Sequence, residues 1–150
     1  MKIIKNEYSI IGLILLVVAI LSYNMASADN PQIDTKKADQ LYKKHCSKCH
    51  RNNGEGIKKV YPPLKNADYI KNASTEELLR GMLFGRSGKV VVNGVSYNGV
   101  MTTEIDGTVS DEDIALMLSY VYQKFNSINI TVKADAVKKA RKAGKLAPHK

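Results

Sequence analysis

The feature that most constrains this chain is the run Cys46-Ser47-Lys48-Cys49-His50, which contains both of its cysteines. Two thiols three residues apart, followed directly by an imidazole, form the Cys-x-x-Cys-His pattern of c-type haem attachment. The thiols add across the haem vinyl groups, and the imidazole reaches the iron. One helical turn puts both thiols on the same side. We therefore expect one haem c per chain, attached through Cys46 and Cys49, with His50 as the proximal iron ligand.

Two other uses of a Cys-x-x-Cys pair are disfavoured. A structural zinc site needs four protein ligands, and His45 and the distant His149 do not supply a second ligand pair at the usual spacing. A thioredoxin-like dithiol is expected near a βαβ pattern, which this sequence lacks. A disulfide or a redox dithiol is the alternative to haem attachment.

Residues 1–28 have the pattern of a secretory signal peptide. Two lysines precede an apolar stretch at residues 10–21 that is short for a membrane span, and Ala26-Ser27-Ala28 offers small residues to a signal peptidase. Cleavage there would leave residues 29–150, whereas an uncleaved anchor is the alternative. Export suits the cysteine motif, because haem is attached to such motifs outside the cytoplasm. We expect the periplasm or an equivalent extracytoplasmic compartment, and no membrane span in the mature form.

The charge of the mature chain favours an acidic partner. Residues 29–150 contain 21 Lys and Arg against 13 Asp and Glu, because the first 28 residues hold two lysines and one glutamate. Such an excess favours acidic redox partner proteins and a fast, salt-sensitive encounter. An exported chain without an aromatic-interleaved basic motif is a poor nucleic-acid binder. The sequence also lacks a nucleophile–base pair, paired carboxylates and a phosphate-binding loop, so we do not expect an enzyme.

Apolar periodicity and capping residues predict three principal helices. The first is expected from Thr35 into the cysteine motif, with His45 on its apolar stripe as a helix residue and not a ligand. The second opens at the capping box Ser74-Thr75-Glu76-Glu77 and ends at Gly85. The third begins at Ser110 and keeps helical spacing to Phe125.

The segments between and after these helices predict a mainly α fold with one small hairpin. Residues 51–64 are expected to form a loop, and residues 89–97 a hairpin around Asn93-Gly94, followed by a loop to Met101. Residues 131–143 predict a fourth, basic helix. We divide the mature chain into a domain at 29–128 and a basic C-terminal helical extension at 129–150. This extension is either a solvated helix at the domain edge or a docking element.

The nature of the second axial ligand distinguishes an electron carrier from a ligand-binding haem protein. A methionine on the distal side closes the iron site and raises its potential, whereas an open site suits small gases. Met82 and Met117 have the helical spacing of core residues. Met101 follows a predicted hairpin in a glycine-containing loop, so we expect it to be the distal ligand.

The order of these motifs resembles that of class I monohaem cytochromes c of the bacterial type. The likeness runs from about Ala38 to Phe125. It rests on the cysteine motif and on five further segments: Gln40-Leu41-Tyr42, Asn53-Gly54-x-Gly56, Tyr61-Pro62-Pro63-Leu64, Gly94 through Tyr97-Asn98-Gly99-Val100-Met101, and the closing helix with Tyr120. The resemblance implies a cytochrome c fold of three to four helices around one covalently bound haem.

The resemblance also implies roles for individual residues. Met101 matches the distal methionine, and Pro62 or Pro63 matches the proline whose carbonyl accepts the N–H of the proximal imidazole, with Pro62 preferred. Gly54 and Gly56 match positions where the backbone passes close to the haem. This chain departs from the pattern after Met101, because Thr102-Thr103 stands where relatives usually have a proline. The loss of that rigid residue predicts a looser methionine loop.

Together these features predict an exported one-electron carrier with His/Met-ligated haem c. Six lysines near the site are candidates for steering a partner: Lys43, Lys44, Lys48, Lys58, Lys59 and Lys65. Two alternatives follow from other features. A displaceable Met101 would suit a sensor or binder of carbon monoxide or nitric oxide, and the basic extension would suit a haem subunit of a larger respiratory complex.

Overall fold

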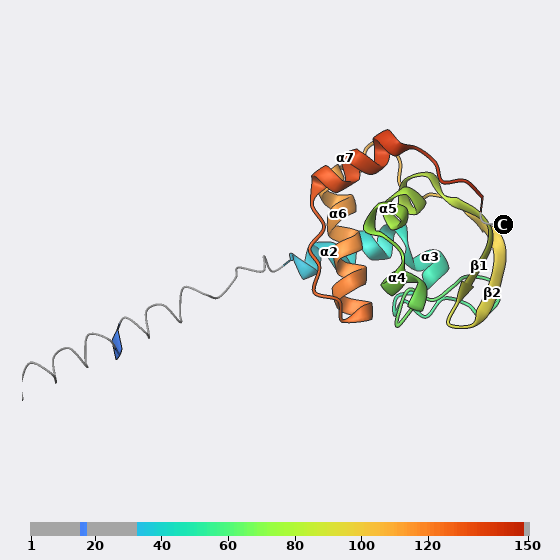
Figure 1. Ribbon diagram of the computed structural model, residues 1–150, viewed down its shortest axis with the longest axis horizontal. Coiled ribbons are helices and arrows are strands. Elements are labelled where there is room, and N and C mark those ends of the chain that lie inside the picture. Colours follow the sequence, from blue (N-terminus) through green and yellow to red (C-terminus); the bar gives the residue numbers. More distant parts are fainter. Residues whose placement is uncertain (1–15, 18–32, 149–150) are drawn as a thin grey trace, which may run out of the picture. The chain divides into compact units, whose positions relative to one another are not determined.

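The structure is a computed structural model that describes residues 16–17 and 33–148 (Figure 1). The chain divides into two compact units at Pro31, and the second unit, Gln32–Lys150, contains every element described below. The predicted signal peptide and its cleavage position lie almost entirely outside the described residues. Within the described residues, no helix is both long enough and apolar enough to cross a membrane.

Helix α2 (Thr35–His45) leads into the cysteine motif, as predicted. It begins where the Asp34 side chain accepts a hydrogen bond from the Lys37 amide, a regular N-cap. After Cys46 the chain continues in the short helix α3 (Ser47–His50). The haem motif therefore lies on helical backbone, which places its residues relative to α2.

Helix α5 (Thr75–Phe84) begins and ends where the sequence predicted, because the Ser74 hydroxyl accepts from the Glu77 amide as N-cap and Gly85 forms the C-cap. The short helix α4 (Asp68–Asn72) precedes it and was not predicted. Five residues are too few for a recognisable apolar period.

The hairpin is longer than the sequence predicted. Strands β1 (Arg86–Val92) and β2 (Val95–Met101) pair antiparallel around Asn93-Gly94, whose φ values of 50° and 75° fit a type I′ turn. The prediction of a loop over residues 97–101 was wrong. The register set by this turn continues to the pair Arg86 and Met101, so backbone pairing outweighs the local turn signal of Asn98-Gly99.

The C-terminal half contains α6 (Asp111–Tyr120), a π-helical segment η1 (Val121–Phe125) and α7 (Ala134–Ala143). Helix α6 packs against α2, and α7 packs against α5 and α6. Figure 1 shows α2 and α6 on one side of this unit and the hairpin on the other. The predicted mainly α architecture with one small antiparallel hairpin is confirmed.

An aromatic cluster holds α2 against α6 and η1. The ring centroids of Tyr42 and Phe125 are 5.0 Å apart, and Tyr120 lies 5.7 Å from Tyr42 and 5.5 Å from Phe125. The hydroxyl of Tyr42 donates to the Arg51 carbonyl at 2.7 Å, directly after the cysteine motif. The core thereby fixes the start of the loop that follows His50.

Candidate functional site

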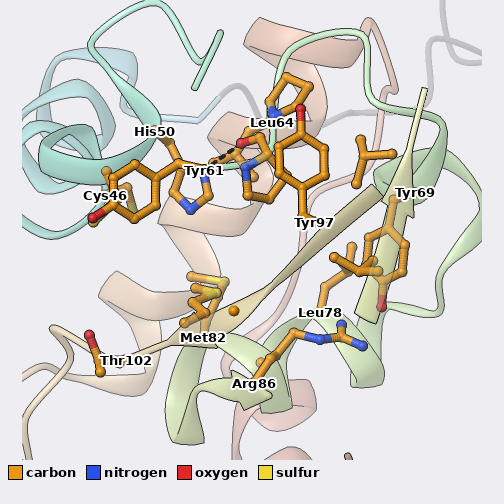
Figure 2. A pocket seen from close by; sticks show the side chains of 18 of the residues that line it. Cys46, His50, Tyr61, Leu64, Tyr69, Leu78, Met82, Arg86, Tyr97 and Thr102 are labelled. Carbon is orange, nitrogen blue, oxygen red and sulfur yellow. Dashed lines mark hydrogen bonds between the residues drawn. The ribbon is translucent and has the colours of Figure 1, made fainter. Parts of the chain in front are cut away.

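One cavity brings five of the seven predicted site residues together. Cys46, Cys49, His50, Pro62 and Met101 all line it, although they come from segments up to 55 residues apart. Most of the remaining wall is apolar and is supplied by α4, α5, the hairpin, α6 and η1. Figure 2 shows this cavity with Cys46 and His50 on the same side. This arrangement fits a flat, largely apolar group attached at one edge.

The two cysteines are free thiols, half-buried in the cavity wall. Burial raises the pKa of the Cys46 thiol to about 12, and the neighbouring Cys49 adds to the shift. Cys46 therefore stays protonated at neutral pH. The neutral thiol supplies both the sulfur and the proton that addition across a vinyl group consumes.

His50 is buried and is held by the backbone of the facing loop. Its Nδ1 lies 2.9 Å from the Pro62 carbonyl, which can only accept, so Nδ1 carries the proton and Nε2 has the free lone pair. The dashed line in Figure 2 marks this bond. Burial lowers the pKa of His50, and the bond to Pro62 opposes part of that shift. The neutral imidazole is the form that binds iron.

This hydrogen bond distinguishes between the two predicted prolines. The carbonyl that His50 contacts belongs to Pro62, which was the preferred residue, and not to Pro63. A buried asparagine stabilises the same loop from behind. Asn126 donates to the Leu64 carbonyl at 2.8 Å and accepts from the Ala67 amide at 3.0 Å. The end of η1 thus fixes the segment that carries Pro62.

Gly54 and Gly56 are not among the residues that line the cavity, and the closeness of their backbone to the haem stays a prediction. A Cβ at Gly54 would meet the Phe125 ring at 3.1 Å. A Cβ at Gly56 would lie 2.3 Å from the Tyr61 carbonyl oxygen and 2.6 Å from that of Pro62. These glycines let the loop close on itself and on the core, which places Pro62 opposite His50.

Met101 lies at the end of β2 and not in a free loop. Its side chain is among the cavity-lining residues, and the residue is 38% exposed. Its backbone packs closely on the end of α5, because a Cβ at Gly85 would be 2.3 Å from the Met101 carbonyl oxygen. The strand and this contact determine where the Met101 sulfur can reach.

The other two methionines of the described region have different surroundings. Met117 is fully buried in the core, as its helical spacing predicted. Met82 is half-buried and points into the same cavity as His50 (Figure 2). Helical periodicity placed Met82 on the inner face of α5, but it could not show that this face borders a cavity instead of the core.

The far wall of the cavity carries a polar group that the sequence did not predict. The Arg86 guanidinium bonds to a Glu77 carboxylate oxygen at 3.0 Å and lies 4.9 Å from the centroid of the Tyr69 ring. The Tyr69 hydroxyl also donates to Glu77, and burial together with that bond raises the pKa of Tyr69 to about 12. Figure 2 shows Tyr69 and Arg86 on the side opposite Cys46. These residues form no motif in the sequence, because three separate elements contribute them.

The residues present fit haem c. Two adjacent thiols face the cavity beside an imidazole whose Nδ1 is already bonded, so Cys46 and Cys49 would hold the porphyrin edge and Nε2 of His50 would bind the iron. Met101 and Met82 both offer a thioether sulfur in the same cavity. No group of three or more His, Cys, Asp and Glu residues that could hold another metal ion is found among the described residues.

Comparison with known proteins agrees with this geometry. Residues 35–124 match the family model for cytochrome c. The match includes the cysteine motif, the loop that carries Pro62, and the hairpin that ends at Met101.

Three individual relatives align with this chain over only part of their own length. Two proteins named cytochrome c-552, both from Thermus thermophilus, are each 37% identical over 79 residues. These alignments cover 51% of this chain and 59% and 52% of the relatives. The fructose dehydrogenase cytochrome subunit of Gluconobacter japonicus is 29% identical over 133 residues, which is 85% of this chain and 27% of that subunit. The chain thus spans about half the length of the two cytochromes c-552 that it matches.

Proposed function

Because this chain belongs to the cytochrome c family, whose members carry covalently attached haem c, we propose that it is an exported one-electron carrier with a His50- and Met101-ligated iron. In this proposal Cys46 and Cys49 attach the haem, which supplies an iron that cycles between the ferrous and ferric states. The single observation that carries the proposal is that both cysteines, His50 and Met101 border one cavity.

The chain's own residues would keep the site closed during electron transfer. The bond from Nδ1 to the Pro62 carbonyl orients the His50 ring and increases its basicity toward iron. Met101 on the opposite side would exclude water and gases from the iron. A fixed ligand set on both sides suits electron transfer, because little has to reorganise when the charge of the iron changes.

The cavity also borders the surface, which an electron carrier requires. Val60, Tyr61, Val100 and Met101 line it and are all exposed, Val100 at 71%. A haem bound there would have one edge close to these side chains. Lys48 lines the cavity. Four of the six predicted steering lysines have no ion pair among the described residues: Lys44, Lys48, Lys58 and Lys59. This favours an acidic redox partner.

Carbon monoxide tests the proposal. The reduced, haem-loaded protein is expected to show no spectral change on addition of carbon monoxide, because His50 and Met101 would both hold the iron and leave no place for the gas. Rapid, complete formation of a carbon monoxide complex would contradict the carrier assignment and favour the sensor. The Met101→Ala variant serves as the control, since it is expected to bind carbon monoxide readily.

A second candidate is a haem subunit of a larger redox complex. It is favoured by the match over 85% of this chain to a protein named as a dehydrogenase cytochrome subunit. Size-exclusion chromatography of the protein from its native source distinguishes the two. A carrier elutes as a monomer, whereas a subunit elutes with a fixed partner.

A further inference from the structure

The segment that follows Met101 is tethered at two points to the rest of the site. The Thr103 hydroxyl donates to the Met82 carbonyl at 2.7 Å, and a ring nitrogen of His45 lies 2.9 Å from the Glu104 carbonyl. Met82 lies in the last turn of α5, and His45 is the last residue of α2. Both bonds span long stretches of chain, 21 and 59 residues respectively.

The Thr103 tether uses a carbonyl that the helix leaves open. The last four carbonyls of an α-helix have no partner within the helix, and Met82 is one of these in α5. The Thr103 hydroxyl oxygen also accepts a hydrogen bond from the Ile105 amide at 3.0 Å, and this bond orients the Thr103 side chain. The side chain is therefore held by its own loop while it donates to α5.

The His45 tether has one defined chemical form. The Glu104 carbonyl can only accept, so Nδ1 of His45 carries the proton. Its Nε2 is buried and has no hydrogen-bond partner within the described part of the chain. The ring thus contributes one hydrogen bond, and that bond joins the residue before Cys46 to the segment after Met101.

We propose that His45 and Thr103 are positioning residues for Met101, which hold the methionine segment against α2 and α5 in place of a rigid residue after the methionine. This inference rests on the proposed function, in which Met101 binds the iron. The close packing of the Met101 carbonyl on Gly85 fixes one end of the segment, and the two tethers fix the next three residues. Loss of a tether raises the fraction of molecules in which Met101 has left the iron.

Imidazole binding to the ferric, haem-loaded protein measures that fraction, because imidazole competes with Met101 and its apparent affinity scales with the open population. His45→Phe and Thr103→Val each remove one tether and keep the volume of the side chain. We expect each to raise the imidazole affinity about fivefold, the effect of one ordinary hydrogen bond. Thr103→Ser keeps the hydroxyl and is expected to restore the wild-type affinity.

Thr108→Val is the matched control for a hydroxyl in the same loop. The Thr108 hydroxyl donates to Asp106, two residues away, and within residues 33–148 it has no hydrogen bond to another element. We expect Thr108→Val to leave the imidazole affinity unchanged. Amide hydrogen exchange at residues 102–105 provides a readout that does not involve the iron, and it is expected to accelerate in His45→Phe and Thr103→Val alone.

Three results would overturn the inference. Wild-type affinity in both His45→Phe and Thr103→Val would show that the tethers do not position Met101. An equal rise in Thr108→Val, with a parallel loss of thermal stability, would show a general structural effect. Met101→Ala is the benchmark: if it binds imidazole no more tightly than wild type, Met101 is not the ligand, and the ligand assignment fails together with this inference. If Met101→Ala binds imidazole tightly while both tether variants keep the wild-type affinity, the positioning inference is rejected and the ligand assignment stands.

Discussion

At the scale of single residues, the proximal side of the site depends on a glycine that does not touch it. Gly56 has φ of 62°, and its α-carbon faces the Tyr61 and Pro62 carbonyls so closely that no side chain fits. The Pro62 carbonyl is also the acceptor for His50. The glycine therefore allows the backbone position at which the Pro62 carbonyl meets His50.

Gly56→Ala should destabilise the haem-loaded protein more than Gly94→Ala. Both glycines have positive φ, which costs an alanine about 1–2 kcal/mol, but Gly94 has nothing within 4 Å of its Cβ position. Crowding at Gly56 should add about 1–3 kcal/mol. Denaturant unfolding measures both free energies, and equal losses in the two variants would contradict this role of Gly56.

Arg86 should raise the reduction potential of the haem. Arg86→Leu removes a positive charge from the cavity wall and leaves Glu77 without that partner. The loss of positive charge near the iron stabilises the ferric state relative to the ferrous state. We expect the potential to fall by an amount on the order of tens of millivolts, since about 59 mV corresponds to a tenfold change in a one-electron equilibrium. Arg86→Lys keeps the charge and is expected to retain most of the potential. A redox titration in which Arg86→Leu has an unchanged or higher potential would refute the expectation.

At the scale of elements, capping residues and apolar periodicity predicted the three principal helices. They did not predict the full length of the hairpin, which depends on pairing between two segments. Ser74 and Ser110 cap α5 and α6 where the sequence placed them. The extension of β2 to Met101 depends on register with β1, and α4 is too short to show a period. For the same reason, the sequence identified the haem motif but could not show Met82 and Arg86 facing the same cavity.

The basic C-terminal helix illustrates how tertiary contacts give a segment its role. Its lysines and arginines predicted either a solvated helix packed on the domain edge or a docking element. In the structure α7 packs on α5 and α6, and its Val137 and Ala140 are buried. Two of its basic residues pair with neighbouring helices: Lys139 with Glu76 at 3.2 Å and Arg141 with Asp111 at 2.7 Å. Helix α7 is thus part of the compact unit that carries the site.

Val137→Ala should therefore destabilise the protein by about 2 kcal/mol, because it removes two buried methyl groups from a fully enclosed position. Lys138→Ala, on the exposed face of the same helix, should change the free energy of unfolding by less than about 0.5 kcal/mol. Denaturant unfolding compares the two. A Val137→Ala variant as stable as Lys138→Ala would show that α7 is not packed on the domain.

At the scale of the whole molecule, net positive charge and an exposed cavity rim favour reaction with anions. The rate of electron transfer to hexacyanoferrate(III) should fall as ionic strength rises, whereas the rate with a cationic cobalt(III) phenanthroline complex should rise. Lys58 lies in the loop that lines the cavity, whereas Lys138 lies on α7. Lys58→Glu and Lys138→Glu change the net charge by the same amount, but Lys58→Glu should slow the reaction with the anion more. Stopped-flow kinetics measure both rates. Equal rates for Lys58→Glu and Lys138→Glu would exclude a local steering effect of the lysines near the cavity.

The central claim is that the iron is bound by His50 and Met101, and the ferric optical spectrum tests it most directly. The purified haem-loaded protein should show the weak sulfur-to-iron charge-transfer band. Met101→Ala should abolish the band, whereas Met82→Leu, which alters the other methionine of the same cavity, should retain it. A band that survives Met101→Ala, or one that disappears in Met82→Leu, would contradict the account.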